Sequence, residues 1–326
     1  GEPSNSLLDI AIKTKKNIIT TNKGPLAIAF SSLIEKADYN NVILKYSAAV
    51  GGGTPILEFG RKCLEADRIL EINAILNGTT NYILSEMDNR ELSFNAALNE
   101  AQKLGYAESD PTLDVDGFDA AAKLVIMGNL LLNKNLVLND LDIKGIRNIT
   151  QEDISKAKDN GNTIKLIASI NKSAKVSPME ISRDDPMCVK GALNSVKFTT
   201  EFAGEEIIIG KGAGGMETAS AIIRDLVEIS ITKTKIEMGK EVKARAEKNA
   251  EERVLDALVG EKSSSETRDS FRQKLRTGEL NNKLIEIKIT SNTSFSLPTM
   301  DIPGMPGSQM GMINLGDVLG KSFSPP

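Results

Sequence analysis

The segment from Leu104 to Lys123 concentrates side chains capable of acid–base chemistry. It contains Glu108, Asp110, Asp114, Asp116 and Asp119, and it ends with Lys123. A helix opened by Ser93 is expected to stop at Gly105, which makes the acidic run a loop. A second helix starting at residue 116 or 117 then places Asp119 and Lys123, four residues apart, on one face. One interpretation is a solvated loop with a surface ion pair worth roughly 0.2–0.5 kcal/mol. The other is a polar pocket in which carboxylates bind a substrate and hold a lysine for proton transfer.

The composition narrows the chemistry that this chain can perform. Among its 326 residues there is no histidine, which excludes Ser-His-Asp and Cys-His catalysis and histidine-bound zinc. The two cysteines, Cys63 and Cys188, cannot build a four-thiolate zinc site, and so low a count indicates the reducing cytoplasm. A net charge of −4 gives no support to nucleic-acid or anionic-membrane binding. Acid–base chemistry must therefore use Lys, Asp, Glu, Tyr or a cofactor.

The first part of the chain alternates helices and strands. We expect helices at 6–13 and 26–37 and strands at 17–21 and 42–46, the pattern of a parallel sheet. Lys23 then lies in a turn just beyond the carboxyl end of a strand, which is the edge where ligands bind in open α/β sheets.

Three further segments carry glycines or hydroxyls at turns. The run Val50–Pro55 permits close backbone approach to a ligand, although an interdomain turn explains it equally well. Asn77–Tyr82 follows an expected strand at 69–76 and suits a small polar ligand, although hydroxyls also cap helices without one. Gly210–Gly215 matches G-x-G-x-x-G, but no acidic residue ends a strand about 20 positions later. We interpret it as a secondary glycine loop that packs near a cofactor or a neighbouring helix. The helix that follows is expected to run from Met216 to Ile229.

The last third of the chain has a different character. Acidic and basic residues alternate from 235 to 288, which indicates a long solvated helix, a break at Ser263–Ser265 and a further helix at 270–277. Residues 290–326 are rich in Ser, Pro, Gly and Met and are expected to be flexible or to be ordered by a partner. No apolar run approaches the roughly 18–20 residues of a membrane span.

In five ordered segments, residues 1 to about 228 resemble homoserine dehydrogenase. The segments are Thr20–Lys23, Val50–Pro55, Asn77–Tyr82, Leu104–Lys123 and Gly210–Ala219. This family reduces aspartate β-semialdehyde to homoserine with NADH or NADPH, so the resemblance implies NAD or NADP as cofactor, a small-molecule substrate and a homodimer. The implied fold class is α/β: a remnant of a Rossmann-like parallel sheet, an α+β catalytic domain, and a mostly helical, partly disordered C-terminal region.

The resemblance also implies roles for individual residues. Lys123 and Lys23 would be the catalytic lysines, with Asp119 orienting Lys123. The substrate would be bound by Glu108, Asp114, Gly78, Thr79 and Tyr106. The cofactor would lie beside Asn22, Lys23, Gly212, Gly214, Gly215 and Thr218. The backbone of Val50 and Gly52 would hold a monovalent cation, although Ser47 stands where many members have an acidic residue.

The implied domains are residues 1–47, a truncated nucleotide-binding domain, and 48–204, an α+β catalytic and dimerisation domain. Residues 205–230 are a glycine loop and a helix that return to the nucleotide-binding domain, and residues 231–326 are a charged helical region with a flexible tail. The family's first strand and phosphate loop would precede Gly1, so we expect weak cofactor binding.

Residues 222–326 resemble the intermediate domain of the HslU ATPase of the HslUV protease. This predicts a chimera joined at residues 222–228, which fit both families, and offers an alternative function. In that alternative, residues 231–326 handle protein substrates or act as a scaffold for a protein partner, without catalysis.

Overall fold

The computed structural model describes residues 2–260 and 262–280. The chain forms two units, residues 1–241 and 242–326, and each is described by itself. Among the described residues, no helix is both long enough and apolar enough to cross a membrane. The flexibility expected for residues 290–326 concerns a segment outside the described residues.

The first unit begins with a small parallel sheet. Strands β1 (Ile18–Ile19) and β2 (Leu44–Lys45) pair in parallel, with Ile18 opposite Leu44. Helices α1 (Glu2–Lys13) and α2 (Lys23–Tyr39) precede and follow β1. The predicted alternation is confirmed, but the predicted turn at Lys23 is wrong, because α2 already begins there. Asn22 caps α2, and its side-chain oxygen accepts a hydrogen bond from the Gly24 amide.

A six-stranded mixed sheet follows, in the order β4-β6-β5-β3-β7-β8. Only β4 and β6 pair in parallel, and the other neighbours are antiparallel. The α/β class is therefore confirmed, with an antiparallel-rich second sheet. The strands are β3 (Ile69–Ile75), β4 (Asp142–Ile143), β5 (Asn162–Ile170), β6 (Ala174–Ser182), β7 (Leu193–Thr200) and β8 (Glu205–Lys211).

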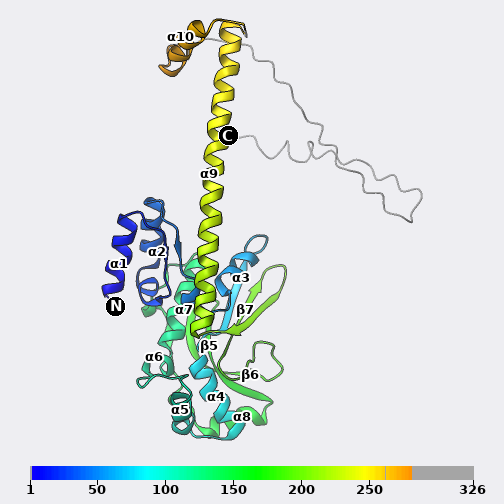
Figure 1. Cartoon of the computed structure of the whole chain (residues 1–326). Coiled ribbons are helices and arrows are strands. Elements are labelled where there is room, and N and C mark those ends of the chain that lie inside the picture. Colours follow the sequence, from blue (N-terminus) through cyan, green and yellow to red (C-terminus); the bar gives the residue numbers. More distant parts are fainter. Residues whose placement is uncertain (1, 261, 281–326) are drawn as a thin grey trace, which may run out of the picture. The chain divides into compact units, whose positions relative to one another are not determined.

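Helices pack on this sheet and on one another (Figure 1). They are α3 (Ile56–Cys63), α4 (Gly78–Arg90), α5 (Phe94–Lys103), α6 (Thr112–Val115), α7 (Phe118–Leu131) and α8 (Gln151–Asp159), with 3₁₀ turns η1 (Ser47–Ala49) and η2 (Leu138–Asp140). Helix α7 is central, because it contacts both α2 and β5. Its residues from Leu124 to Met127 are all fully buried, and this apolar run fixes the helix that carries Asp119 and Lys123.

Helix α9 (Gly215–Val259) is longer than the sequence indicated. We expected the helix to end near residue 229 and another to start near 235, and that break is wrong. The hydroxyls of Ser230 and Thr234 donate to the carbonyls of Leu226 and Ser230, so these residues are satisfied inside the helix.

The second unit contains the end of α9 and helix α10 (Ser265–Arg276), which begins five residues earlier than predicted because Ser264 caps it. Arg268 forms ion pairs with Glu252 and Asp256 and joins the two helices. Leu255 is fully buried between them.

Candidate active site

Asp119 lies between two lysines that are distant in the sequence. Its Oδ1 is 3.0 Å from Nζ of Lys23, and its Oδ2 is 2.8 Å from Nζ of Lys123. Lys23 is at the start of α2, beyond the carboxyl end of β1, whereas Asp119 and Lys123 lie one turn apart on α7. Because α2 and α7 pack together, these side chains meet at one point. Asp119 is buried, so its pairing with Lys123 is not the solvated surface ion pair of the first interpretation.

Asn77 connects this group to a second carboxylate. Its Nδ2 donates to Oδ2 of Asp119 at 2.8 Å and to Oδ1 of Asp114 at 2.6 Å. Its Oδ1 caps α4 by accepting from the Thr80 amide at 2.8 Å. Since Asn77 is only 4% exposed, one buried amide both starts a helix and sets the spacing of two acids.

The Leu76 carbonyl, at the end of β3, fixes the position of the Lys123 ammonium. Lys123 donates to this oxygen at 2.7 Å and to Asp119 at 2.8 Å. An ammonium has three N–H donors, so a third remains for a ligand. Asn194 on β7 also donates to the Leu76 carbonyl, at 3.3 Å. The roles of Leu76 and Asn194 could not be found from the sequence, because a main-chain acceptor and a mid-strand amide leave no motif.

The pKa values of Asp119 and Asp114 are shifted in opposite directions. Burial works to raise the pKa of Asp119, but the charges of Lys123 and Lys23 outweigh it and lower the pKa to about 2. Burial raises the pKa of Asp114, and the hydrogen bond from Asn77 only partly opposes that effect. Asp119 is thus charged at neutral pH, whereas Asp114 forms no ion pair with the described residues and feels the charges of Lys123 and Lys23 only at longer range.

The turn after β3 is packed against its neighbours. Thr79 donates from its hydroxyl to the Tyr106 carbonyl at 2.6 Å, and the rings of Tyr106 and Tyr82 lie 4.9 Å apart. A Cβ on Gly78 would stand 2.7 Å from the Ala192 carbonyl oxygen, so only glycine fits here. Gly78, Thr79 and Tyr106 therefore lie together, next to Asn77.

The two glycine segments contact each other. A Cβ on Gly52, whose φ is +55°, would stand 2.6 Å from the Gly212 carbonyl oxygen. A Cβ on Gly212 would stand 2.0 Å from Nδ2 of Asn194. The Gly210–Gly215 segment includes the end of β8, an antiparallel strand, and the start of α9, and is not the turn of a βαβ unit. It packs on Val50–Gly53 and on the strand that carries Asn194.

Two adjacent residues of α9 hold the ends of the segment from Ser47 to Gly53. Asp225, fully buried, accepts from the Ser47 amide at 3.1 Å and from its hydroxyl at 2.5 Å. Arg224 donates to the Gly53 carbonyl at 3.4 Å and to Glu58 at 3.3 Å. The sequence offered no signal for this pair, because the contacts span more than 160 residues.

Other predicted site residues make hydrogen bonds that do not involve the lysine pair. Glu108 has an exposed side chain, and within the described part of the chain it contributes its main-chain carbonyl to a hydrogen bond from Gln102. Asn22 uses its side chain to cap α2 and to bond Ser4. Gly214 is exposed, and the Thr218 amide donates to its carbonyl at the start of α9.

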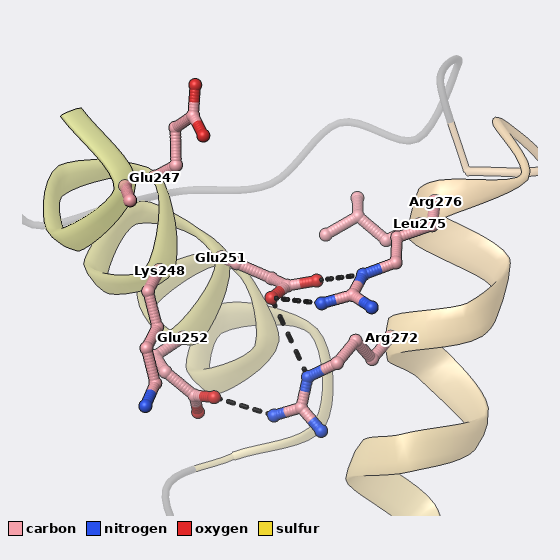
Figure 2. Close-up of a pocket in the computed structure, with 8 residues that line it drawn as sticks. Glu247, Lys248, Glu251, Glu252, Arg272, Leu275 and Arg276 are labelled. Atoms are coloured by element: carbon pink, nitrogen blue, oxygen red, sulfur yellow. Dashed lines mark hydrogen bonds and ion pairs between the residues drawn. The ribbon is translucent and has the colours of Figure 1, made fainter. Parts of the chain in front are cut away.

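A hollow in the second unit offers no comparable chemistry. It is lined by Ala244, Glu247, Lys248, Glu251, Glu252, Arg272, Leu275 and Arg276. Figure 2 shows that the carboxylates of Glu251 and Glu252 already neutralise Arg272 and Arg276. In the described ranges, no group of three or more Cys, Asp or Glu residues is arranged to hold a metal ion.

The geometry agrees with comparisons to known proteins. A family model of homoserine dehydrogenase matches residues 55–227. A homoserine dehydrogenase of Methanocaldococcus jannaschii is 45% identical over 230 residues, which are 70% of this chain and 68% of that protein. The chain belongs to the homoserine dehydrogenase family. The matched range includes residues 222–227, which the sequence had assigned to two families, and the comparisons give no support to the HslU resemblance of residues 222–326.

The homoserine dehydrogenase family is one of oxidoreductases whose cofactor is NAD or NADP. An NAD(+)-dependent homoserine dehydrogenase of Pseudomonas canavaninivorans is 39% identical over 242 residues, 72% of this chain and 68% of that protein. A hyperthermophilic archaeal homoserine dehydrogenase, solved in complex with NADPH, is 28% identical with a TM-score of 0.64 and covers 71% of this chain and 69% of that one. The predicted family, enzyme class and cofactor are confirmed.

Proposed function

We propose that this chain reduces aspartate β-semialdehyde to homoserine, with Lys123 as the proton donor to the reacting oxygen. The observation that carries the proposal is the position of Asp119 between Nζ of Lys23 and Nζ of Lys123, at 3.0 and 2.8 Å. A carbonyl that is being reduced develops negative charge on its oxygen, and a fixed ammonium both stabilises that charge and supplies a proton.

Each lysine has a distinct part in this proposal. Lys123, whose side chain is 12% exposed, is held by two acceptors and aims its remaining proton at the substrate. Lys23, whose side chain is 40% exposed, has the freedom to contact substrate or cofactor. Asp119 holds the ammonium groups of both lysines in place.

Asp114 is proposed to bind the α-amino group of the substrate. Burial and the neighbouring charge of Asp119 raise its pKa, so a substrate ammonium would relieve an existing electrostatic cost. Gly78, Thr79 and Tyr106 form the adjoining wall, and Glu108 at its exposed position is proposed only as an outer contact.

Two features fit a nicotinamide cofactor beside this group. Lys23 lies beyond the carboxyl end of a parallel strand, with Asn22 next to it. Gly215 has no atom within 4 Å of the place where a Cβ would stand, so its backbone is open to a ligand near Gly212, Gly214 and Thr218. The nicotinamide supplies the hydride when it is bound. A cation on the carbonyls of Val50 and Gly52 stays a prediction.

We also propose the boundaries 1–47, 48–204, 205–230 and 231–326 as functional divisions, a homodimer, and the cytoplasm as compartment. The free thiols of Cys63 and Cys188 support the last of these. Equilibrium sedimentation tests the dimer. The non-catalytic scaffold function is not proposed, since no comparison supports it.

The test of the function is the Lys123→Met variant, assayed for aspartate-semialdehyde reduction by the loss of NADH or NADPH absorbance. We expect kcat to fall by about 10²–10⁴-fold, because the proton donor is lost. Lys144→Met is the matched control, because Lys144 is an exposed lysine paired with Asp142 in the same unit, and it should leave kcat unchanged. A Lys123→Met variant with wild-type kcat would overturn the assignment.

A further inference from the structure

Lys165, in the middle of β5, is a buried lysine that the proposed reaction does not use. It is 3% exposed, and in the described part of the chain its hydrogen-bond partners are neutral side chains, with no carboxylate among them. Its Nζ donates to Oδ1 of Asn81 at 2.7 Å and to the hydroxyl of Ser85 at 2.9 Å, both on α4. Burying a lysine that has only neutral hydrogen-bond acceptors costs free energy, and a structural or functional role must offset that cost.

The surroundings favour a role as a hydrogen-bond donor over a role as a charge. Burial lowers the pKa of Lys165 to about 8; the groups facing it are Cys188, Asp88, Arg183 and Lys190, whose influences oppose one another. A neutral amine keeps two N–H donors, the same number as the acceptors that Asn81 and Ser85 present. The two hydrogen bonds therefore survive loss of the proton.

Asn81 connects Lys165 to the loop from residue 189 to 193. Its Nδ2 donates to the carbonyls of Val189 and Leu193, at 3.2 and 3.0 Å. Asn81 is 1% exposed, so each of these bonds replaces one to water. Without the donor on Lys165, the Asn81 oxygen would be left buried and unpaired, and the amide would have reason to rotate away from the loop.

The loop from 189 to 193 in turn supports the start of α4. The Ala192 carbonyl oxygen lies close enough to Gly78 that a Cβ there would stand 2.7 Å away. Gly78 follows Asn77, the amide that spaces Asp114 and Asp119. A continuous set of contacts thus joins Lys165 to the two acids.

We infer that Lys165 is a positioning residue for the substrate-binding turn: it fixes Asn81, which fixes the loop 189–193, against which Gly78 and Asn77 are placed. Lys165 touches neither substrate nor cofactor. The kinetic part of this inference rests on the proposed function, whereas the structural part does not.

The test compares Lys165→Met with Ser85→Ala by amide hydrogen exchange. Lys165→Met keeps the length and removes both donors, while Ser85→Ala removes one hydrogen bond of Lys165 that does not lead to the loop. In Lys165→Met we expect exchange at the Met187–Val189 and Thr80–Asn81 amides to rise about tenfold or more, with α2 unchanged as an internal reference. Ser85→Ala should leave all of these amides as in the wild type.

Kinetics separate positioning from general destabilisation. For Lys165→Met we expect KM for aspartate β-semialdehyde to rise about tenfold while kcat stays within about threefold, because binding geometry is lost and the proton donor is not. If the wild type shows no dehydrogenase activity, the proposed function fails, and the exchange data alone decide this inference.

A second variant guards against misfolding. Asn81→Asp keeps an oxygen for Lys165 but replaces the donor to Val189 and Leu193 by a carboxylate oxygen that repels their carbonyls. It should loosen the same loop while pairing with Lys165. Unchanged exchange at Met187–Val189 in the folded variants would overturn the inference.

Discussion

Replacing Asp119 by asparagine removes one negative charge at the centre of the site and keeps its shape. In the wild type, this carboxylate neutralises Lys23 and Lys123 and accepts from Asn77. In Asp119→Asn, two ammonium groups face a neutral amide whose N–H₂ must point toward a lysine or toward Asn77. Both stability and activity should therefore decrease.

The size of the stability loss follows from the pKa of Asp119. That pKa lies at about 2 in the folded protein against an ordinary value of 3.8, because Lys123 and Lys23 outweigh the burial cost. At about 1.4 kcal/mol per unit, the charged form contributes about 2 kcal/mol to the free energy of unfolding at neutral pH. The folded pKa is depressed, so this contribution is present above about pH 4 and is lost as pH falls through about 2.

Tyrosine fluorescence measures the loss in the free energy of unfolding for the first unit, which contains Asp119. The sequence has no tryptophan and four tyrosines, Tyr39, Tyr46, Tyr82 and Tyr106, all within residues 1–241. Urea titration followed by this signal therefore reports unfolding of the first unit. We expect a loss of about 2 kcal/mol for Asp119→Asn at pH 7, shrinking toward zero near pH 2.

Asp116→Asn is the matched control. Asp116 lies on the same segment and pairs with Arg147, but both side chains are partly exposed, so the loss should be much smaller. In the same preparations, kcat of Asp119→Asn should fall by about 10²-fold or more, since Lys123 is no longer held. Equal stability of Asp119→Asn and wild type across this pH range would refute the electrostatic reasoning.

Three further outcomes are expected. Asp114→Asn should raise KM for aspartate β-semialdehyde by about 10–100-fold with kcat nearly unchanged, because a charged partner of the amino group is lost. Steady-state kinetics measure this, and an equal change in the exposed Asp110→Asn would contradict it. Gly78→Ala should destabilise the first unit by about 1–3 kcal/mol in urea, because its Cβ would meet the Ala192 carbonyl, whereas Gly239→Ala, in open space on α9, should not. The free energy of unfolding of the wild type, minus that of Lys165→Met, should rise from pH 8 to 10.5 by up to roughly 3 kcal/mol. The reason is that Lys165 loses its proton near pH 8 in the folded protein but near 10.5 in the unfolded chain; a difference that does not change with pH would count against that pKa.

The local elements of this fold could be predicted from sequence where a cap or a glycine marks an end. Ser93 caps α5 by accepting from the Ala96 amide, and Gly105 follows the helix with φ +77°, as its position predicted. Helix α6 was missed, since four residues within an acidic loop give no periodicity. The prediction divided α9 in two, because Ser and Thr residues inside a helix, whose hydroxyls bond back to helix carbonyls, cannot be told by residue type from those that end a helix.

The site shows the same division between local and long-range information. The pairing of Asp119 with Lys123 follows from helical spacing, and their contact with Lys23 was implied only by the family resemblance. Asn194 and Arg224 could not be found, because their importance depends on which distant backbone they reach. Sequence distance hides such contacts until the tertiary packing is known.

The dipeptide Asn77-Gly78 has a consequence for how this enzyme ages. Asparagine followed by glycine is prone to deamidation. The backbone nitrogen of the glycine attacks the side-chain carbonyl carbon, ammonia leaves, and water opens the resulting cyclic imide to aspartate or isoaspartate. In the folded protein the side-chain oxygen of Asn77 accepts a hydrogen bond from the Thr80 amide, and its side-chain nitrogen donates to Asp114 and Asp119. Heat-stressed protein should therefore deamidate at Asn77 mainly through unfolded molecules. Each damaged copy would carry a third carboxylate beside Lys123, so the chemical lifetime of the site depends on the stability that Asp119 provides.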